Sequence, residues 1–294
     1  MSRFKTYNIE KAQNKMSSIV VGTDFSNGSY IALELAIDIA NKMKTDVKLI
    51  WVKREKKLFT DEQLDSAIHL ATDKLADLQE KYSRRLTGGK FTAEVRSGKV
   101  AQVLGAAAKE EKAPMIVCGT NGASGFERYF MGSTAVRIVQ DSPCPVLTIR
   151  EGFNFHKDLE NIVMPIRVNE TSRQKVPFTT EMARIFGSRV HILGLIDSPV
   201  YASDLRTYIF QIEEYMKQEG VKHSSVVKRY SNYCDTVMKY AEDIDADLVA
   251  INTEQNIPLN VARIFLGTNA QQIVHHSQIP VLCIHPHDIG WLSK

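Results

Sequence analysis

The sequence predicts an α/β protein made of two tandem open-sheet domains, each with a five-stranded, mostly parallel sheet and helices on both faces. Short segments rich in β-branched residues alternate with segments of helical periodicity, as in sheets with crossover helices. The candidate strands are almost continuously apolar, which fits burial on both faces. IVQDSPCPVLTIR at 138–150 also aligns without gaps with IVHHSQIPVLCIH at 273–285. The chain is therefore interpreted as two copies of one domain.

The first copy begins with the strand candidate SIVVGTD at 18–24. A helix is predicted next, because apolar residues from Ala32 to Met43 recur at helical spacing, and Ser26 or Asn27 is its expected N-cap. The remaining elements are expected to be a strand at 47–53, a long helix at 60–85, a strand at 91–97 ended by Gly98, a helix at 100–111, a strand at 113–120, a helix at 133–141 and a strand at 144–150.

The second copy repeats this order. ENIVMPIRVN at 160–169 parallels SSIVVGTDFS at 17–26, and a second helix near 203–219 is expected to be shorter than its counterpart. A repeat this long indicates two complete domains, because solenoid repeats are typically about 20–50 residues. We expect domains at 1–152 and 158–294, joined near EGFNFHKD.

The composition excludes several classes of function. With 37 basic and 34 acidic residues the net charge is only +3, and no arginine-rich arm or zinc-finger spacing indicates a nucleic-acid partner. No apolar run approaches the roughly 20 residues of a membrane span. The polar N-terminal sequence has no signal-peptide core, so we expect a cytoplasmic protein. The cysteines form no CxxC motif and are expected to be reduced and mostly buried: Cys118, Cys144, Cys234 and Cys283.

Three segments of the first copy are expected to meet where its strands end, which is where ligands bind in doubly wound sheets. They are GTDFS at 22–26, Val52 at the end of the second strand, and a Gly-rich loop that follows the fourth strand. Within the first segment, the Asp24 carboxylate is suited to accept hydrogen bonds from ribose hydroxyls.

The Gly-rich loop has a defined spacing. Two residues separate Gly119 from Gly122, nine more precede Gly132, and Ser133 and Thr134 follow. Glycine lets a ligand approach the backbone closely. A helix that starts at Gly132 offers N–H groups and hydroxyls to phosphate oxygens. The spacing favours a nucleotide site, although a loop that only connects strand to helix remains an open alternative.

Four features together resemble the universal stress protein family: IVVGTDFS at 19–26, Gly98-Lys99, the Gly-x2-Gly-x9-Gly-Ser pattern at 119–133, and SPCPVLTI at 142–149. The last two are the most specific. The pattern is complete in the first copy and degenerate in the second, so the chain resembles a tandem member. The resemblance implies a Rossmann-like fold similar to the adenine nucleotide alpha hydrolases. The branch of the family that binds ATP carries the glycine motif, and the other branch lacks it.

The resemblance implies ATP or ADP as the ligand of the first copy, and leaves open whether Mg accompanies it. Asp24, with Gly22 and Thr23 beside it, would meet the ribose, and the Val52 backbone would read the adenine. The first part of the loop would pass near the ribose and α-phosphate: Gly119, Thr120, Asn121 and Gly122. The helix start would hold the β- and γ-phosphates: Gly132, Ser133 and Thr134.

The second copy departs from this pattern. Arg167, or Val168 if the turn shifts, takes the position of Asp24, and Asn252 takes that of Gly119. The segment from Asn252 to Gly267 is longer than its counterpart and contains no glycine. We therefore expect the second copy to hold no nucleotide.

The expected function is a stress response in which ATP or ADP binding to the first domain regulates binding to other molecules. The sequence offers donors for phosphate but no evident general base, so we expect at most weak ATPase activity and assign no catalytic residue. No Walker A motif occurs. A nucleotide-free scaffold and a slow ATPase remain the alternatives.

Metal binding is not expected. His275 and His276 are adjacent on a predicted helix and so face apart, while His285 and His287 belong to the tail. All four are interpreted as surface histidines.

The last strand candidates of the two copies, at 144–150 and 279–285, bear on assembly. In the family this strand pairs across a dimer interface. The resemblance therefore implies pairing of the two domains within one chain, and leaves a homodimer open.

Overall fold

The computed structural model describes residues 17–53, 61–120, 133–153, 159–169, 171–253 and 268–285. Contacts divide these residues into two compact units, one ending at Phe153 and the other following it. We call them domain 1 and domain 2 and describe each by itself.

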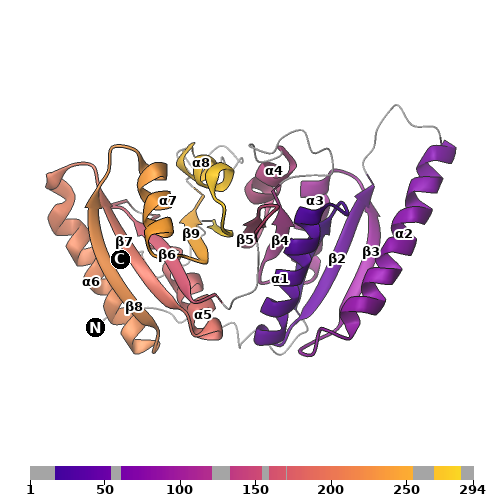
Figure 1. Ribbon diagram of the computed structural model, residues 1–294, viewed down its shortest axis with the longest axis horizontal. Coiled ribbons are helices and arrows are strands. Elements are labelled where there is room, and N and C mark those ends of the chain that lie inside the picture. The colour runs from indigo at the N-terminus through magenta and orange to yellow at the C-terminus, as the bar shows by residue number, and fades with distance from the viewer. Residues whose placement is uncertain are drawn as a thin grey trace. The chain divides into compact units, whose positions relative to one another are not determined.

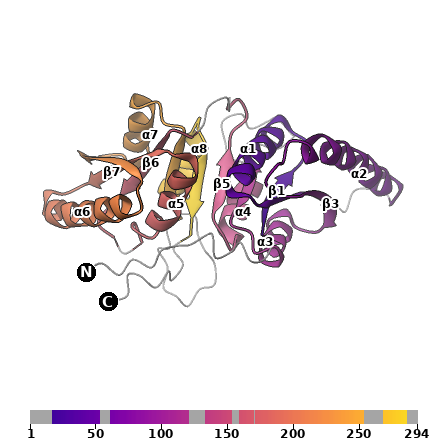
Figure 2. The same ribbon diagram turned by 90° about the horizontal axis from the view of Figure 1, so that it is seen from below.

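Domain 1 is a doubly wound α/β domain. Its strands lie in the order β3-β2-β1-β4-β5, and the pairs are parallel. Helices α1 and α2 cover one face of this sheet, and α3 and α4 cover the other (Figure 2). Its elements are β1 (Ser18–Thr23), α1 (Asn27–Met43), β2 (Asp46–Lys53), α2 (Asp61–Ser83), β3 (Phe91–Ser97), α3 (Val100–Glu110), β4 (Ile116–Gly119), α4 (Ser133–Asp141) and β5 (Val146–Ile149).

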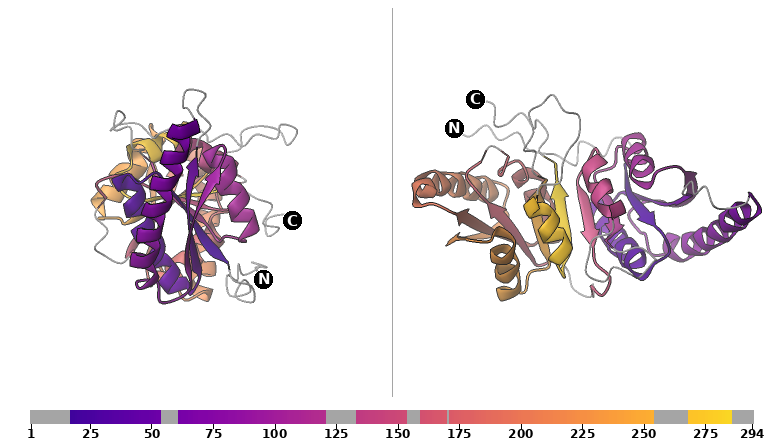
Figure 3. Two further views of the ribbon diagram at one scale, coloured as in Figure 1. Left: turned by 90° about the vertical axis from the view of Figure 1, so that its right-hand side faces the viewer. Right: turned by 90° about the horizontal axis from the view of Figure 1, so that it is seen from above.

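Domain 2 repeats this topology with the strand order β10-β9-β6-β7-β8 and parallel pairs. Figures 1 and 3 show the helices on both faces of each sheet. Its elements are β6 (Asn161–Ile166), α5 (Val176–Phe186), β7 (Arg189–Ile196), the 3₁₀ turn η2 (Pro199–Tyr201), α6 (Ala202–Gln218), β8 (Lys222–Arg229), α7 (Tyr233–Asp243), β9 (Leu248–Asn252), α8 (Thr268–His276) and β10 (Val281–Ile284). The predicted fold class is confirmed.

The core of each domain surrounds its sheet. In β1, Ile19, Val20 and Val21 are fully buried although their side chains alternate between the two faces, as expected of a parallel sheet covered on both sides. All four cysteines are buried free thiols, and burial raises the pKa of Cys118 to about 12. Within the described ranges, no helix combines the length and apolar character needed to cross a membrane.

The strand registers show which positions correspond in the two domains. Ser18 of β1 pairs with Asp46, and Asn161 of β6 pairs with Arg189 at the same place in the ladder. Counting forward from Ser18 and Asn161, Arg167 occupies the position of Asp24. The sequence alone allowed either Arg167 or Val168 as the counterpart of Asp24. The register of the β6–β7 pair identifies Arg167.

The fourth strands align in the same way. Val20 pairs with Ile116, and its counterpart Val163 pairs with Val249. Asn252 therefore stands where domain 1 has Gly119, as the sequence predicted.

The first helices of the two domains end at corresponding residues but begin differently. Ser26 caps α1 by accepting a hydrogen bond from the Ser29 backbone N–H, so one of the two predicted N-caps is confirmed. By the same correspondence, α5 begins more than one turn later, at Val176. Pro177 explains the late start, because proline is tolerated in the first turn of a helix but not farther inside.

The C-caps of these helices differ in residue type but not in conformation. Lys44 after α1 has φ 52°, and Gly187 after α5 has φ 70°. Both lie in the left-handed region, which is unfavourable for residues with a Cβ.

We therefore expect Lys44→Gly to stabilise domain 1 by about 0.5–1 kcal/mol. The measurement is urea unfolding followed by Trp51 fluorescence in a Trp291→Phe background, which leaves one tryptophan. Lys42→Gly is the matched control. Lys42 lies inside the last turn of α1, where glycine should cost about 1 kcal/mol. Equal destabilisation by both variants would contradict the assignment of the cap.

Candidate functional site

The predicted site lies where β1 and β4 end. Among the described residues these strands pair only through Val20–Val21 and Ile116–Val117. The connection after β1 leads to α1 on one face, and the connection into β4 comes from α3 on the other (Figure 2). The strand order thus reverses between β1 and β4, which is the topological switch point where open α/β sheets bind ligands.

A network of short side chains fixes Asp24 at this edge. Its Oδ1 accepts hydrogen bonds from the Ser26 backbone N–H at 3.1 Å and the Ser26 hydroxyl at 2.5 Å. One residue earlier, the buried Thr23 hydroxyl accepts from the Phe25 N–H at 3.1 Å and lies 3.0 Å from the Ser29 hydroxyl. The turn after β1 is therefore cross-linked to the first turn of α1, and the carboxylate has a set orientation.

Phe25 lies at this edge beside Asp24, and the sequence alone did not single it out as a candidate. Its φ of 62° places a bulky residue in the left-handed region, a strained conformation that is uncommon for such residues and that clusters at functional sites. The ring stacks on Trp51 with centroids 6.3 Å apart and planes at 21°, and Lys74 Nζ lies 5.1 Å from the Phe25 centroid. The sequence offered one signal for this contact: an aromatic residue adjoins each of the predicted site residues Asp24 and Val52. Nothing in the sequence distinguished Lys74 from the other lysines.

Gly119 is required by packing. A Cβ at this position would lie 2.9 Å from the Gly28 carbonyl carbon and 3.1 Å from the Ser29 nitrogen. Gly22 is less constrained, because its Cβ would meet Leu104 Cδ1 at 2.7 Å, the end of a side chain that can rotate. Gly119 thus brings the end of β4 against the first turn of α1 and shapes the edge with or without a ligand.

The other predicted residues are only partly described. Val52 is buried next to Trp51, which pairs with Thr23. The buried Thr120 donates its N–H to Ile149 O at 2.8 Å, and Thr134 is half-buried on α4. Asn121, Gly122 and Gly132 lie outside the described residues, as does the side chain of Ser133, the first residue of α4. The structure therefore places Thr23, Asp24, Val52 and Gly119 at the same edge of the sheet.

The same edge of domain 2 carries cations. The Arg167 guanidinium lies 4.7 Å from the centre of the Tyr233 ring, and its backbone N–H donates to Ser172 Oγ at 2.9 Å. Lys175 is 2% exposed, and its ammonium donates to the Ser172 carbonyl and to Asn252 Oδ1, both at 2.7 Å. At this edge, among the residues that the structure describes, domain 2 has the cation of Arg167 where domain 1 has the Asp24 carboxylate.

The interpretation of the tail histidines is wrong for His285. This residue is 2% exposed, and its Nδ1 lies 2.6 Å from Thr253 Oγ1. The histidine follows β10 and Thr253 follows β9, two paired strands, so the pairing buries the ring. His276 is exposed and His275 half-buried, while His287 lies outside the described residues. The described side chains include no group suited to hold a metal ion.

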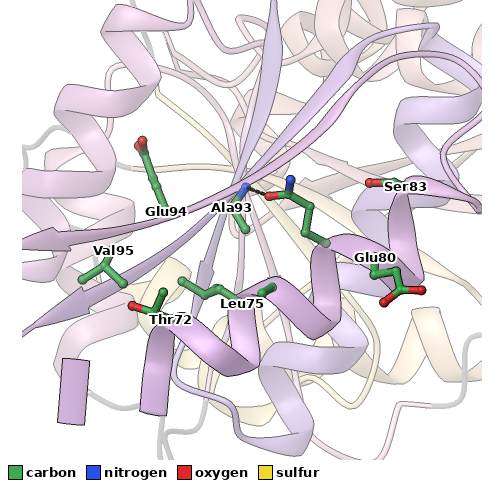
Figure 4. A pocket seen from close by; sticks show the side chains of 9 residues that line it. Thr72, Leu75, Glu80, Ser83, Ala93, Glu94 and Val95 are labelled. Carbon is green, nitrogen blue, oxygen red and sulfur yellow. Dashed lines mark hydrogen bonds between the residues drawn. The ribbon is translucent and has the colours of Figure 1, made fainter. Parts of the chain in front are cut away.

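A cavity of about 490 Å³ lies elsewhere, between α2 and the edge strand β3 (Figure 4). Gln79 Oε1 accepts a hydrogen bond from the Ala93 backbone N–H at 3.1 Å in its wall. Glu80 and Glu94 also line it, and their carboxylates do not suit a phosphate ligand. This cavity is separate from the predicted nucleotide site.

Comparison with known proteins identifies the family. The model of the universal stress protein family matches residues 16–150 and again residues 159–285. The universal stress protein Rv2319c of Mycobacterium tuberculosis is 25% identical over 292 aligned residues, covering 91% of this chain and 99% of the relative. The universal stress protein MJ0531 of Methanocaldococcus jannaschii is 29% identical, covering 49% of this chain and 87% of its own.

The crystal structure of a universal stress protein from Archaeoglobus fulgidus has the same fold. Its TM-score is 0.74 at 16% identity, with 93% of this chain and 98% of that chain covered. The family model matches most of the chain in two tandem segments. The chain therefore belongs to the universal stress protein family.

The packing role of Gly119 can be tested without any ligand. We expect Gly119→Ala to destabilise domain 1 by about 1–3 kcal/mol, because backbone atoms of α1 must move, which is an overpacking cost. Gly22→Ala is the control, with an expected loss below about 1 kcal/mol because Leu104 can adjust. Urea unfolding followed by Trp51 fluorescence compares the two, and equal losses would contradict a special role for Gly119.

Proposed function

We propose that domain 1 binds ATP or ADP at the carboxyl ends of β1 and β4, and that the bound nucleotide controls a stress-response interaction with other molecules. The observation that carries the proposal is the Asp24 carboxylate, held by two hydrogen bonds from Ser26 at the switch point of the sheet. Membership of the universal stress protein family supports the stress-response role.

In this proposal different residues of the edge contact different parts of the nucleotide. Asp24 accepts hydrogen bonds from the ribose hydroxyls, and the backbone of Val52 reads the adenine. The stacked rings of Phe25 and Trp51 give this end of the site an apolar aromatic wall. Lys74, beside Phe25, adds a cation to it.

We propose that the phosphates are bound by the loop from Gly119 to Gly122 and by the start of α4. The helix N-terminus offers N–H groups to phosphate oxygens, and the Ser133 and Thr134 hydroxyls add donors. Mg would accompany the phosphates as it does in solution. Among the described residues of this edge no side chain is placed as a general base toward a γ-phosphate, so we propose binding with slow hydrolysis at most.

Domain 2 is not a second copy of this site in the proposal. Arg167 replaces the carboxylate that would meet the ribose, and the Asn252 side chain lies where Gly119 allows close approach. Its first helix also begins more than a turn later. We therefore propose one nucleotide per chain.

The direct test has two stages. The purified protein is gently denatured and the released small molecules are identified by mass spectrometry, where we expect ATP or ADP. Nucleotide-free protein is then titrated with Mg-ATP by calorimetry, and Asp24→Asn should weaken binding at least tenfold, about 1.4 kcal/mol.

Asp46→Asn is the matched control for this titration. Asp46 is also a half-buried carboxylate that accepts a backbone hydrogen bond, from the Lys90 N–H, but it lies at the amino end of β2. Its replacement should leave the affinity for Mg-ATP unchanged. Absence of released nucleotide together with a flat titration, or equal losses in both variants, would overturn the proposal.

A further inference from the structure

β8 is the outermost strand of the domain 2 sheet. It is the last strand in the order, and among the described strands only β7 pairs with it (Figure 1). Tyr230, which follows β8, donates its N–H to Ile196 O of β7 at 3.1 Å. In a parallel pair the backbone groups of alternate residues point to the same neighbour. The N–H and C=O groups of four residues of β8 therefore point away from β7: His223, Ser225, Val227 and Arg229.

The outer side of β8 differs from the corresponding side of β3 in domain 1. The strand registers make Ser225 the counterpart of Ala93. The outward N–H of Ala93 donates to Gln79 Oε1 at 3.1 Å. No described residue accepts a hydrogen bond from the N–H of Ser225 or Val227, and both residues are exposed. Unpaired backbone groups along an edge strand are ready to pair with a further strand.

The side chains of β8 are basic and include no carboxylate. Its sequence KHSSVVKR begins with Lys222 and His223 and ends with Lys228 and Arg229. Within the described part of the chain no carboxylate forms an ion pair with any of these four residues. Side chains of directly opposite residues in a strand pair lie about 4.5–5.5 Å apart. Any strand that pairs with β8 therefore meets positive charge at both ends.

These charges determine which kind of strand can pair with β8. Antiparallel pairing with β8 of a second copy would place Lys222 opposite Arg229, and like charges at opposite positions destabilise a strand pair. An acidic strand would form ion pairs at both ends instead. Val226 and Val227 lie between the charged ends. Val227 is 45% exposed, so a partner strand would cover apolar surface there.

We propose that β8 binds an extended, acidic segment of a partner protein, which adds to domain 2 as a further strand. The outward backbone groups of β8 supply the hydrogen bonds, as in other cases of strand addition. Acidic residues at the two ends of the segment lie opposite the cations, and β-branched residues lie opposite Val226 and Val227. The proposal goes beyond the nucleotide site of domain 1 and does not rest on it.

The experiment adds the full-length protein to two fluorescein-labelled peptides, EDVVTTED and EDTTVVED, which match β8 in the antiparallel and the parallel direction. Fluorescence anisotropy should show saturable binding of at least one of them. The affinity should fall about fivefold between about 50 mM and about 300 mM sodium chloride, because salt screens exposed ion pairs. The control peptide KKVVTTKK carries the same label and should not bind.

Two substitutions of one exposed residue test the backbone pairing. Ser225→Pro removes the outward N–H, and proline is accepted on an edge strand where that N–H faces solvent. It should weaken binding at least tenfold, about 1.4 kcal/mol. Ser225→Ala is the matched control, because it also lacks the hydroxyl but keeps the N–H, and it should bind as the wild type does.

A double variant tests the charges and does not depend on whether Ser225→Pro folds. Lys222→Gln/Arg229→Gln changes two exposed side chains of β8 and should weaken binding about fivefold, as expected for the loss of exposed ion pairs. Lys109→Gln, at an exposed lysine of α3 in domain 1, is its control and should leave the affinity unchanged.

Three results would overturn the proposal. In the first, neither acidic peptide binds better than KKVVTTKK. In the second, the β8 variants that fold, other than Ser225→Ala, bind as the wild type does. In the third, sedimentation shows a dimer of the wild-type chain that Lys222→Gln/Arg229→Gln strengthens and the acidic peptides do not dissociate, which would make a second copy the occupant of β8.

Discussion

The close approach of the end of β4 to the first turn of α1 is the constraint on which the edge of domain 1 depends. Gly119 permits it, because any Cβ there would meet the backbone of Gly28. With the helix start held against the strand, Ser29 reaches the Thr23 hydroxyl and Ser26 reaches Asp24. The orientation of the carboxylate therefore follows from packing that exists without a ligand.

Domain 2 has no glycine at the position of Gly119, and its edge is built differently. Asn252 brings a side chain to the same position, the helix begins only at Val176, and the intervening turn places Lys175 against Asn252. One fold thus presents a carboxylate in one copy and cations in the other. We propose that, of these two edges, only that of domain 1 takes a nucleotide.

The alternation of strands and helices, the repeat and the Ser26 cap could be predicted from the sequence, because local periodicity and capping chemistry determine them. The exchange of Gly119 for Asn252 was also visible, since the flanking segments align. The sequence could not show that Gly119 is needed for packing. A glycine that leaves room for a ligand cannot be told by sequence from one that lets a helix pack against a strand.

The missed features depend on contacts between distant segments. Phe25 adopts its left-handed conformation with Trp51 and Lys74 packed around it, from β2 and α2. His285 is buried because β10 pairs with β9 and brings Thr253 beside it. Lys175 was not singled out, since a lysine before a helix usually faces solvent. Burial of these residues depends on tertiary contacts that no local pattern contains.

The central claim is that the two copies have diverged at the same edge and that only domain 1 keeps a nucleotide site. The most direct measurement is equilibrium dialysis of nucleotide-free protein against labelled ATP with Mg, carried to saturation. We expect one ATP per chain. Two ATP per chain bound with similar affinity would contradict the claim.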